Sequence, residues 1–210
     1  MGQHSRHPLM SPLPRCIVVD SNFIISYITK KDTTASDRAR IDHFISEVDK
    51  LKVRIIFPMI SISEFLVKAD AASVAFLEEL ERKSTVFVAD FDRGAAQELA
   101  KMEREALAGP GGKRAGSEEP YQKIKVDRQI VAIGLAHGAK MIISRDEGVR
   151  TQAIRLRLEA KRIQDLELPE SAKQLTLIAP VSKGRRLNFR PAPLTVVPTP
   201  PAPAQVPKTD

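Results

Sequence analysis

The chain has 210 residues, 42% of them hydrophobic and 28% charged, a composition typical of a globular protein. The net charge of +7 lies at the two ends: residues 1–15 contribute +2, residues 171–210 contribute +5, and the stretch between them is neutral. No stretch approaches the ~18 uncharged apolar residues of a membrane helix, and the N-terminus lacks the apolar segment of a secretory signal. The single cysteine, Cys16, excludes an internal disulfide framework and favours a reducing compartment, so we expect a cytoplasmic protein without membrane association.

The first part of the chain alternates between apolar runs and helical patterns. Residues 1–14 contain three prolines and no periodicity, and we predict that they are disordered. The run CIVV at 16–19 predicts a buried strand, and VRIIF at 53–57, which is closed by a proline, predicts a second one. Residues 21–29 and 36–50 between these strands have apolar side chains at helical spacing.

The same alternation continues through the middle of the chain. Residues 61–82 are predicted to be helical, as one helix or two, and TVFVA at 85–89 predicts a third strand. Residues 92–107 form an amphipathic helix pattern, and the glycines and prolines of residues 109–120 predict a mobile loop. An Ala-rich helix is predicted at 126–137, where Gly138 marks its end.

The last predicted elements complete an α/β pattern. KMIIS at 140–144 predicts a fourth strand and residues 147–158 a further helix, while a last strand falls in 161–168 or in 174–179. Strands that are apolar throughout and alternate with helices indicate a parallel sheet covered on both faces. We therefore predict a three-layer α/β/α domain over residues 15–170 with a central parallel sheet of four or five strands. The remaining residues, 171–210, are basic and then Pro-rich, and we predict that they are mostly disordered.

Four acidic residues stand where a predicted element begins or ends. Asp20 and Asp146 follow apolar strands, and Glu64 and Asp127 lie near predicted helix starts. Each one alone is explained as a helix cap or as a first-turn acid that complements the helix dipole. In a parallel sheet, however, strands end and helices begin at one edge, where ligands bind, so the four acids are expected to converge there.

Convergence of carboxylates indicates a bound cation. Like charges a few ångströms apart raise one another's pKa and destabilise the fold, and a hard divalent cation removes that cost. Mg²⁺ prefers carboxylate oxygens, keeps several waters, and suits the hydrolysis of phosphate esters. The sequence therefore predicts a Mg²⁺ or Mn²⁺ site at this edge of the sheet.

The order and context of these residues resemble the PIN-domain family of metal-dependent ribonucleases, whose VapC-like members include toxins of bacterial toxin–antitoxin pairs. The resemblance spans about residues 15–165 and rests on four segments: IVVDSN, SISEFL, VDRQIVAIG and IISRD. The matching positions are Asp20, Asn22, Glu64, Asp127, Ser144 and Asp146. The family often has one more acid two residues after the last aspartate, where this chain has Gly148.

The resemblance implies a PIN-like fold, Mg²⁺ or Mn²⁺ as cofactor, and hydrolysis of phosphodiester bonds in RNA. It implies that Asp20, Asp127 and Asp146 bind the metal directly or through water, and that Glu64 binds it too or orients the attacking water. Asn22 and Ser144 would hold the carboxylates or contact the scissile phosphate. A small antitoxin protein and a homodimer are the partners that the family suggests, besides the RNA substrate.

Three basic residues near the acids are candidate RNA contacts: Arg128, Arg145 and Lys125. The two arginines have a second interpretation, in which they partly neutralise the acidic cluster. Two other functions remain open. A catalytically inactive PIN-like module would bind RNA or protein without cleaving it. A phosphatase with Asp-x-Asp after its first strand, or a phosphate-accepting receiver domain, fits less well, because "DSN" lacks the second aspartate and no lysine follows the strand at 140–144.

Overall fold

A five-stranded parallel sheet forms the centre of the computed structural model, which describes residues 13–29 and 33–173. The strands follow the order β3-β2-β1-β4-β5 across the sheet, and every neighbouring pair is parallel. Their bounds are β1 Cys16–Val19, β2 Arg54–Pro58, β3 Val86–Ala89, β4 Met141–Ile143 and β5 Glu159–Lys161. Disorder was predicted for residues 1–14 and 171–210, and of these 1–12 and 174–210 lie outside the described part of the chain. Residues 171–173 are described and are helical, so the order extends slightly beyond the predicted boundary at residue 170.

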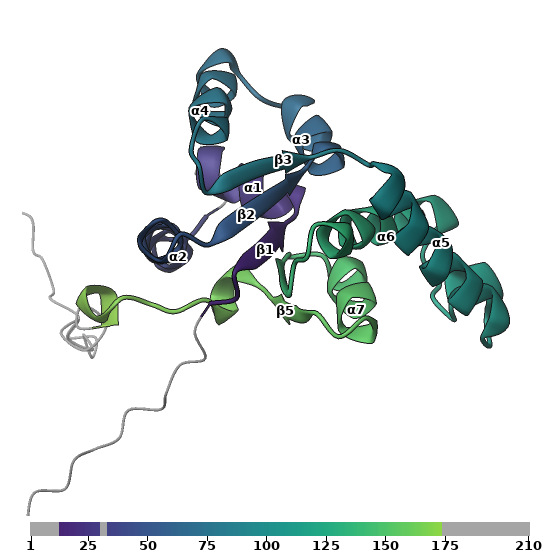
Figure 1. Ribbon diagram of the computed structural model, residues 1–210. Helices are drawn as coiled ribbons and strands as arrows, with labels where there is room; N and C mark the ends of the chain where they lie inside the picture. The colour runs from purple at the N-terminus through teal and green to yellow at the C-terminus, as the bar shows by residue number, and fades with distance from the viewer. Residues whose placement is uncertain (1–12, 30–32, 174–210) are drawn as a thin grey trace, which may run out of the picture.

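Helices cover both faces of the sheet, which confirms the predicted three-layer α/β/α architecture (Figure 1). Their bounds are α1 Ser21–Thr29, α2 Ala35–Leu51, α3 Met59–Leu66, α4 Ala71–Glu81, α5 Arg93–Ala108, α6 Tyr121–Ala136 and α7 Glu147–Arg155. Two short 3₁₀ helices follow α5 and β5: η1 Gly112–Arg114 and η2 Ile163–Asp165. Helices α1 to α4 pack on one face of the sheet and α5 to α7 on the other, so the molecule has two hydrophobic cores.

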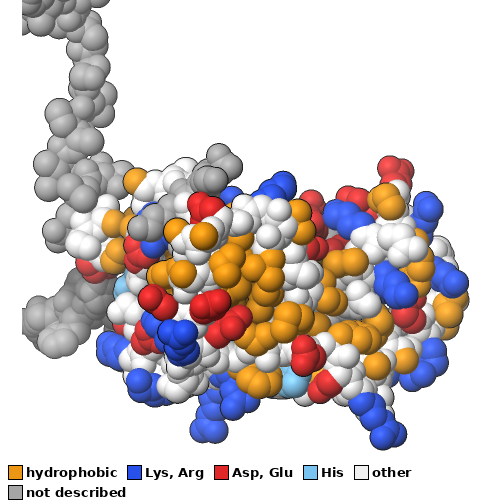
Figure 2. Space-filling view, turned by 90° about the horizontal axis from the view of Figure 1, so that it is seen from above, with side chains coloured by type: hydrophobic (Ala, Val, Ile, Leu, Met, Phe, Trp, Pro, Cys, Tyr) orange, Lys and Arg blue, Asp and Glu red, His pale blue; other side chains and the backbone are white. Residues whose placement is uncertain are grey.

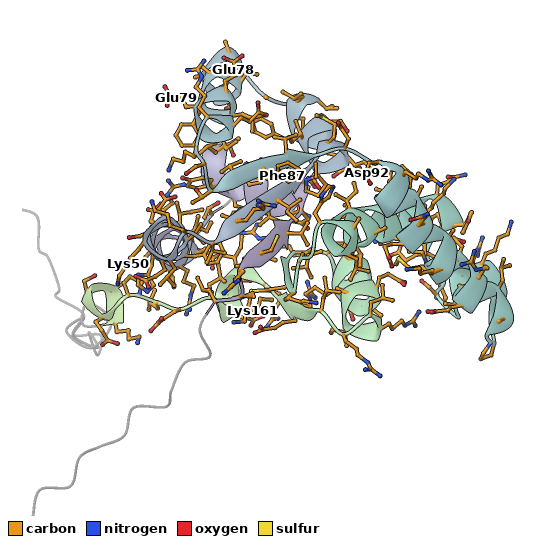
Figure 3. The ribbon with its side chains drawn as sticks, viewed as in Figure 1. Lys50, Glu78, Glu79, Phe87, Asp92 and Lys161 are labelled. Atoms are coloured by element: carbon orange, nitrogen blue, oxygen red, sulfur yellow. The ribbon has the colours of Figure 1, made fainter. Side chains whose placement is uncertain are left out.

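The strand β1 contributes to both cores, which explains why all four of its residues are apolar. Successive side chains of a strand point to opposite faces. Ile17 and Val19 belong to the core under α1 to α4, whereas Cys16 and Val18 belong to the core under α5 to α7. The outer strands are less buried, and Figure 3 labels Phe87 on the edge strand β3 and Lys161 on the opposite edge strand β5.

The helical stretch predicted at 61–82 is two helices, α3 and α4, joined by residues 67–70. Asp70 caps α4 by accepting a 2.8 Å hydrogen bond from the amide of Ser73. Helix α3 begins at Met59, directly after Pro58, so Ser61 does not cap it, and no side chain makes a cap hydrogen bond there.

Two other boundaries differ from the sequence prediction. Helix α6 begins at Tyr121, behind Pro120, and not at residue 126. The last strand is β5 at Glu159–Lys161, which shares only residue 161 with the predicted range 161–168. Residues 174–179 lie outside the described part of the chain. Within the described ranges, no helix combines the length and the apolar character that a membrane crossing requires.

Helix α6 lies very close to β1 at one glycine. A Cβ atom at Gly134 would lie 2.7 Å from Cγ1 of Val18, inside van der Waals contact with a side chain that is fully buried. The absence of a side chain at Gly134 therefore sets the distance between the helix and the central strand.

Replacing Gly134 by alanine is expected to lower the free energy of unfolding by about 1–2 kcal/mol. Overpacking a core costs roughly 1–3 kcal/mol, and the better helix propensity of alanine offsets up to about 1 kcal/mol of that loss. Urea unfolding followed by circular dichroism measures the change. An unchanged or higher unfolding midpoint would contradict the close packing of α6 on β1.

Candidate functional site

A crevice opens where the direction of the strand order reverses. Strand β1 is followed in sequence by β2 on one side and has β4 on its other side, so the switch point lies between β1 and β4. In open parallel sheets, ligands bind outside the carboxyl ends of the strands at such a point. Val19 pairs with Ile143 at these ends, and the amide of Asp20 donates to the carbonyl of Ile143 at 3.2 Å.

A pocket of about 310 Å³ lies at this switch point, and all four acids predicted from the sequence line it. They are Asp20, Glu64, Asp127 and Asp146, which come from the end of β1, from α3, from α6 and from the start of α7. Asn22 also lines the pocket. The predicted convergence of carboxylates from distant parts of the chain is therefore present in the structure.

Asp20 is held rigidly by three hydrogen bonds. Its Oδ1 atom accepts from the amide of Phe23 at 2.9 Å, as expected of a residue that caps α1. Its Oδ2 atom accepts from the hydroxyl of Ser144 and, at 3.4 Å, from the side-chain amide of Asn22. The carboxylate is 2% exposed, and this burial raises its pKa, although the hydrogen bonds from Ser144, Phe23 and Asn22 act in the opposite direction. Ser144 and Asn22 thus hold a carboxylate, as predicted.

Asp146 uses one carboxylate oxygen for structure and keeps the other for the pocket. Its Oδ1 atom caps α7 by accepting from the amides of Gly148 at 2.7 Å and Val149 at 3.3 Å. Its own amide donates to the hydroxyl of Ser144 at 2.9 Å. The Oδ2 atom lies 3.4 Å from Nζ of Lys123. The capping and the functional interpretations of Asp146 are therefore compatible.

Asp127 has no structural role of that kind. It lies within α6 and does not cap it, because the helix begins six residues earlier at Tyr121. Its side chain is 7% exposed, and among the described residues its carboxylate takes part in no hydrogen bond or ion pair. Burial and the neighbouring carboxylate of Asp146 raise the pKa of Asp127 to about 6, while Lys123 acts in the opposite direction.

Helix α7 makes room for Asp127 at Gly148. A Cβ atom at this glycine would lie 2.4 Å from Oδ2 of Asp127 and 3.0 Å from Oδ1 of Asp146. The residue that stands in place of a further acid thus allows Asp127 to approach the first turn of α7.

Glu64 and Lys123 lie at the more open side of the pocket. Glu64 is exposed on α3, and it does not form a capping box with Ser61, because α3 begins at Met59. Lys123 lies on the first turn of α6, where it contacts Glu119 at 3.0 Å as well as Asp146. A cationic side chain next to these acids lowers their mutual repulsion.

The donor atoms of the pocket fit a hard divalent cation that keeps part of its water shell. The candidate ligands are carboxylate oxygens, and the buried carboxylate of Asp127 lacks any other partner in the described chain. Over residues 13–29 and 33–173, no three His, Cys, Asp or Glu side chains are placed to hold a metal ion together. Mg²⁺ commonly binds through one or two carboxylates and several waters, and such a site matches this arrangement.

The three basic residues predicted to contact RNA lie outside the pocket. Arg128 is only 1% exposed and donates to Glu103 at 2.9 Å, so the structure gives no exposed surface for an RNA phosphate at this residue. Arg145 lies 3.6 Å from the buried carboxylate of Asp37. Lys125 is exposed on α6, where contact with RNA stays a prediction.

Besides Ser21 and the apolar part of the lining, two polar residues of the pocket were not among the predicted site residues: Gln122 and Lys123. Both lie on α6 on the same face as Val126, Asp127 and Ile130. A helix that begins at Tyr121 places these residues on one face, because residues three or four apart lie on the same side of a helix. Pro120 could have indicated this earlier helix start, but the glycines and prolines before it suggested that the loop continued.

The fold and the pocket together define an α/β protein with a carboxylate-lined crevice at the switch point of a parallel sheet. No protein-family model matches the sequence, and no curated protein matches it either. A similar solved structure is the crystal structure of VapBC2 from Rickettsia felis bound to a DNA fragment from their promoter. The similar chain is 14% identical, the alignment covers 70% of this chain and 98% of that chain, and the TM-score is 0.49.

Proposed function

We propose that this protein is a PIN-like endoribonuclease that hydrolyses phosphodiester bonds in RNA with the help of Mg²⁺ or Mn²⁺. The observation that carries the proposal is the unpaired, buried carboxylate of Asp127 in one pocket with Asp20, Asp146 and Glu64. Burial and the carboxylate of Asp146 raise the pKa of Asp127, and carboxylates perturbed in this way and lining a crevice are typical of functional sites. A divalent cation bound there supplies charge neutralisation at the scissile phosphate and lowers the pKa of a bound water.

The side chains of the pocket take distinct parts in this proposal. Asp127 and the Oδ2 atom of Asp146, which also lies 3.4 Å from Nζ of Lys123, would hold the cation with its waters, and Asp20, fixed by Ser144, lines the same pocket. Glu64 is exposed at the rim and is the carboxylate best placed to orient a water and accept its proton. Lys123 faces the same space and offers its ammonium group to a nonbridging phosphate oxygen.

Cleavage of labelled single-stranded RNA, with Mn²⁺ or with EDTA, tests the proposal. We expect cleavage with Mn²⁺ alone, and its loss in Asp146→Asn, whose side-chain oxygen still caps α7. Asp92→Asn is the matched control, because Asp92 caps α5 through the amide of Ala95 at 2.8 Å and lies outside the pocket (Figure 3). RNA binding without any metal-dependent cleavage would reject the nuclease and favour the alternative, a catalytically inactive binding module.

The replacement Gly148→Ala is expected to lower cleavage about 10- to 100-fold without unfolding the protein. The new methyl group displaces Asp127, and small misplacements of a reacting group cost up to about 100-fold in rate. Alanine at this helical position is itself favourable. Initial rates and the Mn²⁺ concentration for half-maximal activity measure the effect.

Gly94→Ala is the control for this prediction. Gly94 is also the second residue of a helix capped by an aspartate, and a Cβ atom there would meet its nearest neighbours at 3.3 and 3.4 Å. We expect full activity from this variant. Equal losses in the two variants would show that Gly148 affects the fold and not the position of Asp127.

A small antitoxin-like protein and a second copy of the chain are further proposed partners. Their support is a set of exposed apolar side chains on α3, directly after α3, on β3 and in the connection to α5. These residues are Met59, Leu66, Val67, Phe87 and Phe91. Figure 2 shows hydrophobic side chains gathered over the middle of the face seen from above. Light scattering of the purified chain, alone and with the products of neighbouring reading frames, distinguishes self-association from binding of another protein.

A further inference from the structure

Lys123 brings an ammonium group to the acidic pocket. It lies on the first turn of α6, four residues before Asp127, so the two side chains lie on the same face of the helix. Its Nζ atom lies 3.4 Å from Oδ2 of Asp146. Of the described residues that line this pocket, Lys123 is the only one with a cationic side chain. The protein thus already holds one positive charge among the acids.

Only one oxygen of Asp146 is available to a cation. Its Oδ1 atom accepts hydrogen bonds from the amides of Gly148 and Val149 at 2.7 and 3.3 Å. The Oδ2 atom is therefore the one that both Lys123 and a metal ion would use. A metal ion on Oδ2 would have the ammonium group as a second cation beside the same oxygen, and like charges at that range repel each other.

The charge of the pocket also favours the exchange of one cation for the other. Four carboxylates and one ammonium group give the lining a formal charge of −3. Burial and the carboxylate of Asp146 raise the pKa of Asp127, and Lys123 is the cation that acts against them. A divalent ion supplies more positive charge than the ammonium group does. Lys123 therefore stabilises the acids when no metal is bound, and a bound metal ion replaces that contribution.

Glu119 gives Lys123 a second partner outside the pocket. The Nζ atom of Lys123 lies 3.0 Å from Oε1 of Glu119, which precedes α6 and is not part of the pocket lining. The side chain of Lys123 is 40% exposed and has a flexible stem, so its charge can move without being buried. Lys123 can thus leave Asp146 and still keep a carboxylate partner.

We propose that Lys123 takes the place of the divalent cation in the metal-free protein and moves to Glu119 when a metal ion binds Asp146. This inference rests on the metal site of the proposed function. Lys123 then has two effects, because it stabilises the metal-free pocket and lowers the affinity of that pocket for the metal. It also sets an order of events, in which the ammonium group becomes available to an RNA phosphate only after the metal has bound.

Titration of the full-length, metal-free protein with Mn²⁺ tests this inference, with the free ion measured by its electron paramagnetic resonance signal. We expect Lys123→Met to bind Mn²⁺ at least about 5-fold more tightly than wild type, because a competing positive charge is removed. Lys123→Arg keeps the charge and should stay within about 2-fold of wild type. Lys125→Met is the matched control, since Lys125 is exposed on the same helix outside the lining, and it should also change the affinity by less than about 2-fold.

Urea unfolding separates this role from a purely structural one. Lys123→Met is expected to unfold at a lower urea concentration than wild type in EDTA, because the carboxylates lose their counter-charge. A fixed concentration of Mn²⁺ should then raise its unfolding midpoint by more than that of wild type, in keeping with tighter binding. A lower midpoint in EDTA without tighter Mn²⁺ binding would show a structural role alone and would overturn the inference.

The outcome for Asp127→Asn tells failure of this inference from failure of the proposed function. If Asp127→Asn weakens Mn²⁺ binding while Lys123→Met leaves it unchanged or weakens it, the metal site stands and the inference about Lys123 is wrong. If neither wild type nor the Lys123 variants bind Mn²⁺, both the metal site and the inference are wrong. Binding that is tighter in Lys123→Met and weaker in Asp127→Asn supports both.

Discussion

The variant Asp20→Asn is expected to lower RNA cleavage at least about 100-fold while its free energy of unfolding stays within about 1 kcal/mol of the wild-type value. Loss of a group that acts directly in catalysis typically costs roughly 10²- to 10⁴-fold. Asparagine is about as good an N-cap as aspartate, so the hydrogen bond from the amide of Phe23 persists. The hydroxyl of Ser144 reorients and accepts from the new side-chain amide.

We expect a large effect on activity and a small effect on stability because the Asp20 carboxylate has two separate roles. The Oδ1 atom of Asp20 serves the helix cap, and its negative charge serves the acidic pocket. Burial already raises the pKa of Asp20, so replacement by a neutral side chain relieves a desolvation cost. Initial cleavage rates in Mn²⁺ and urea unfolding in EDTA are compared with those of Asp92→Asn. An active, metal-independent Asp20→Asn protein would end the proposed mechanism.

The strands β1 to β4 and two of the four acids were within reach of sequence reasoning. The apolar runs that form β1 and β4 are buried on both faces, and short continuous apolar runs are typical of strands in a parallel sheet. Asp20 directly follows β1, and Asp146 follows β4 with two residues between. Because the carboxyl ends of neighbouring parallel strands meet at one edge, their proximity follows from the fold class alone.

The positions of Glu64 and Asp127 were predicted on the right elements but for an incorrect local reason. Both residues resemble helix-start acids in the sequence, and both lie inside helices that begin earlier, behind Pro58 and Pro120. A proline directly before a helix was the stronger signal, because its fixed φ and missing amide suit that position. The edge strand β5 was missed for another reason: its sequence, Glu-Ala-Lys, is short and polar and leaves no hydrophobic pattern.

The burial of Arg128 was beyond prediction from the sequence. An arginine beside a candidate metal ligand is most simply interpreted as a contact for phosphate or as a counter-charge to the acids. Its side chain instead turns away from the acids toward Glu103 on α5, and α5 and α6 pack against each other along their lengths (Figure 1). Such a partner is set by helix packing, which no local pattern encodes.

In metal-free buffer, Asp127→Asn is expected to unfold at higher urea concentration than wild type at pH 7.5 and at about the same concentration at pH 4. The native pKa of Asp127 is raised to about 6, whereas an unfolded aspartate titrates near about 3.9. The folded protein therefore holds this proton more tightly than the unfolded chain. The stability that Asp127 contributes is fully present below about pH 4 and is lost as the pH rises through about 6.

Asparagine does not ionise, so the variant keeps this stability as the pH rises. We expect its free energy of unfolding at pH 7.5 to exceed that of wild type by about 1–2 kcal/mol, which is less than the whole pKa shift would give because the pocket is open to solvent. Asp165→Asn is the control of opposite sign. Hydrogen bonds from the side chain and amide of Arg162 lower the pKa of Asp165, so its stabilising contribution is present at neutral pH and is lost on acidification. Asp165→Asn should therefore destabilise the protein at pH 7.5.

Saturating Mn²⁺ should reverse the order of wild type and Asp127→Asn at pH 7.5. A ligand at about 100 times its Kd adds roughly 2.7 kcal/mol to the form that binds it, and only the wild-type protein keeps the carboxylate. The same variant that is more stable without metal becomes the less stable one with metal. If Asp127→Asn gained no stability at pH 7.5, or gained as much from Mn²⁺ as wild type does, Asp127 would not be the strained carboxylate on which the proposed function rests.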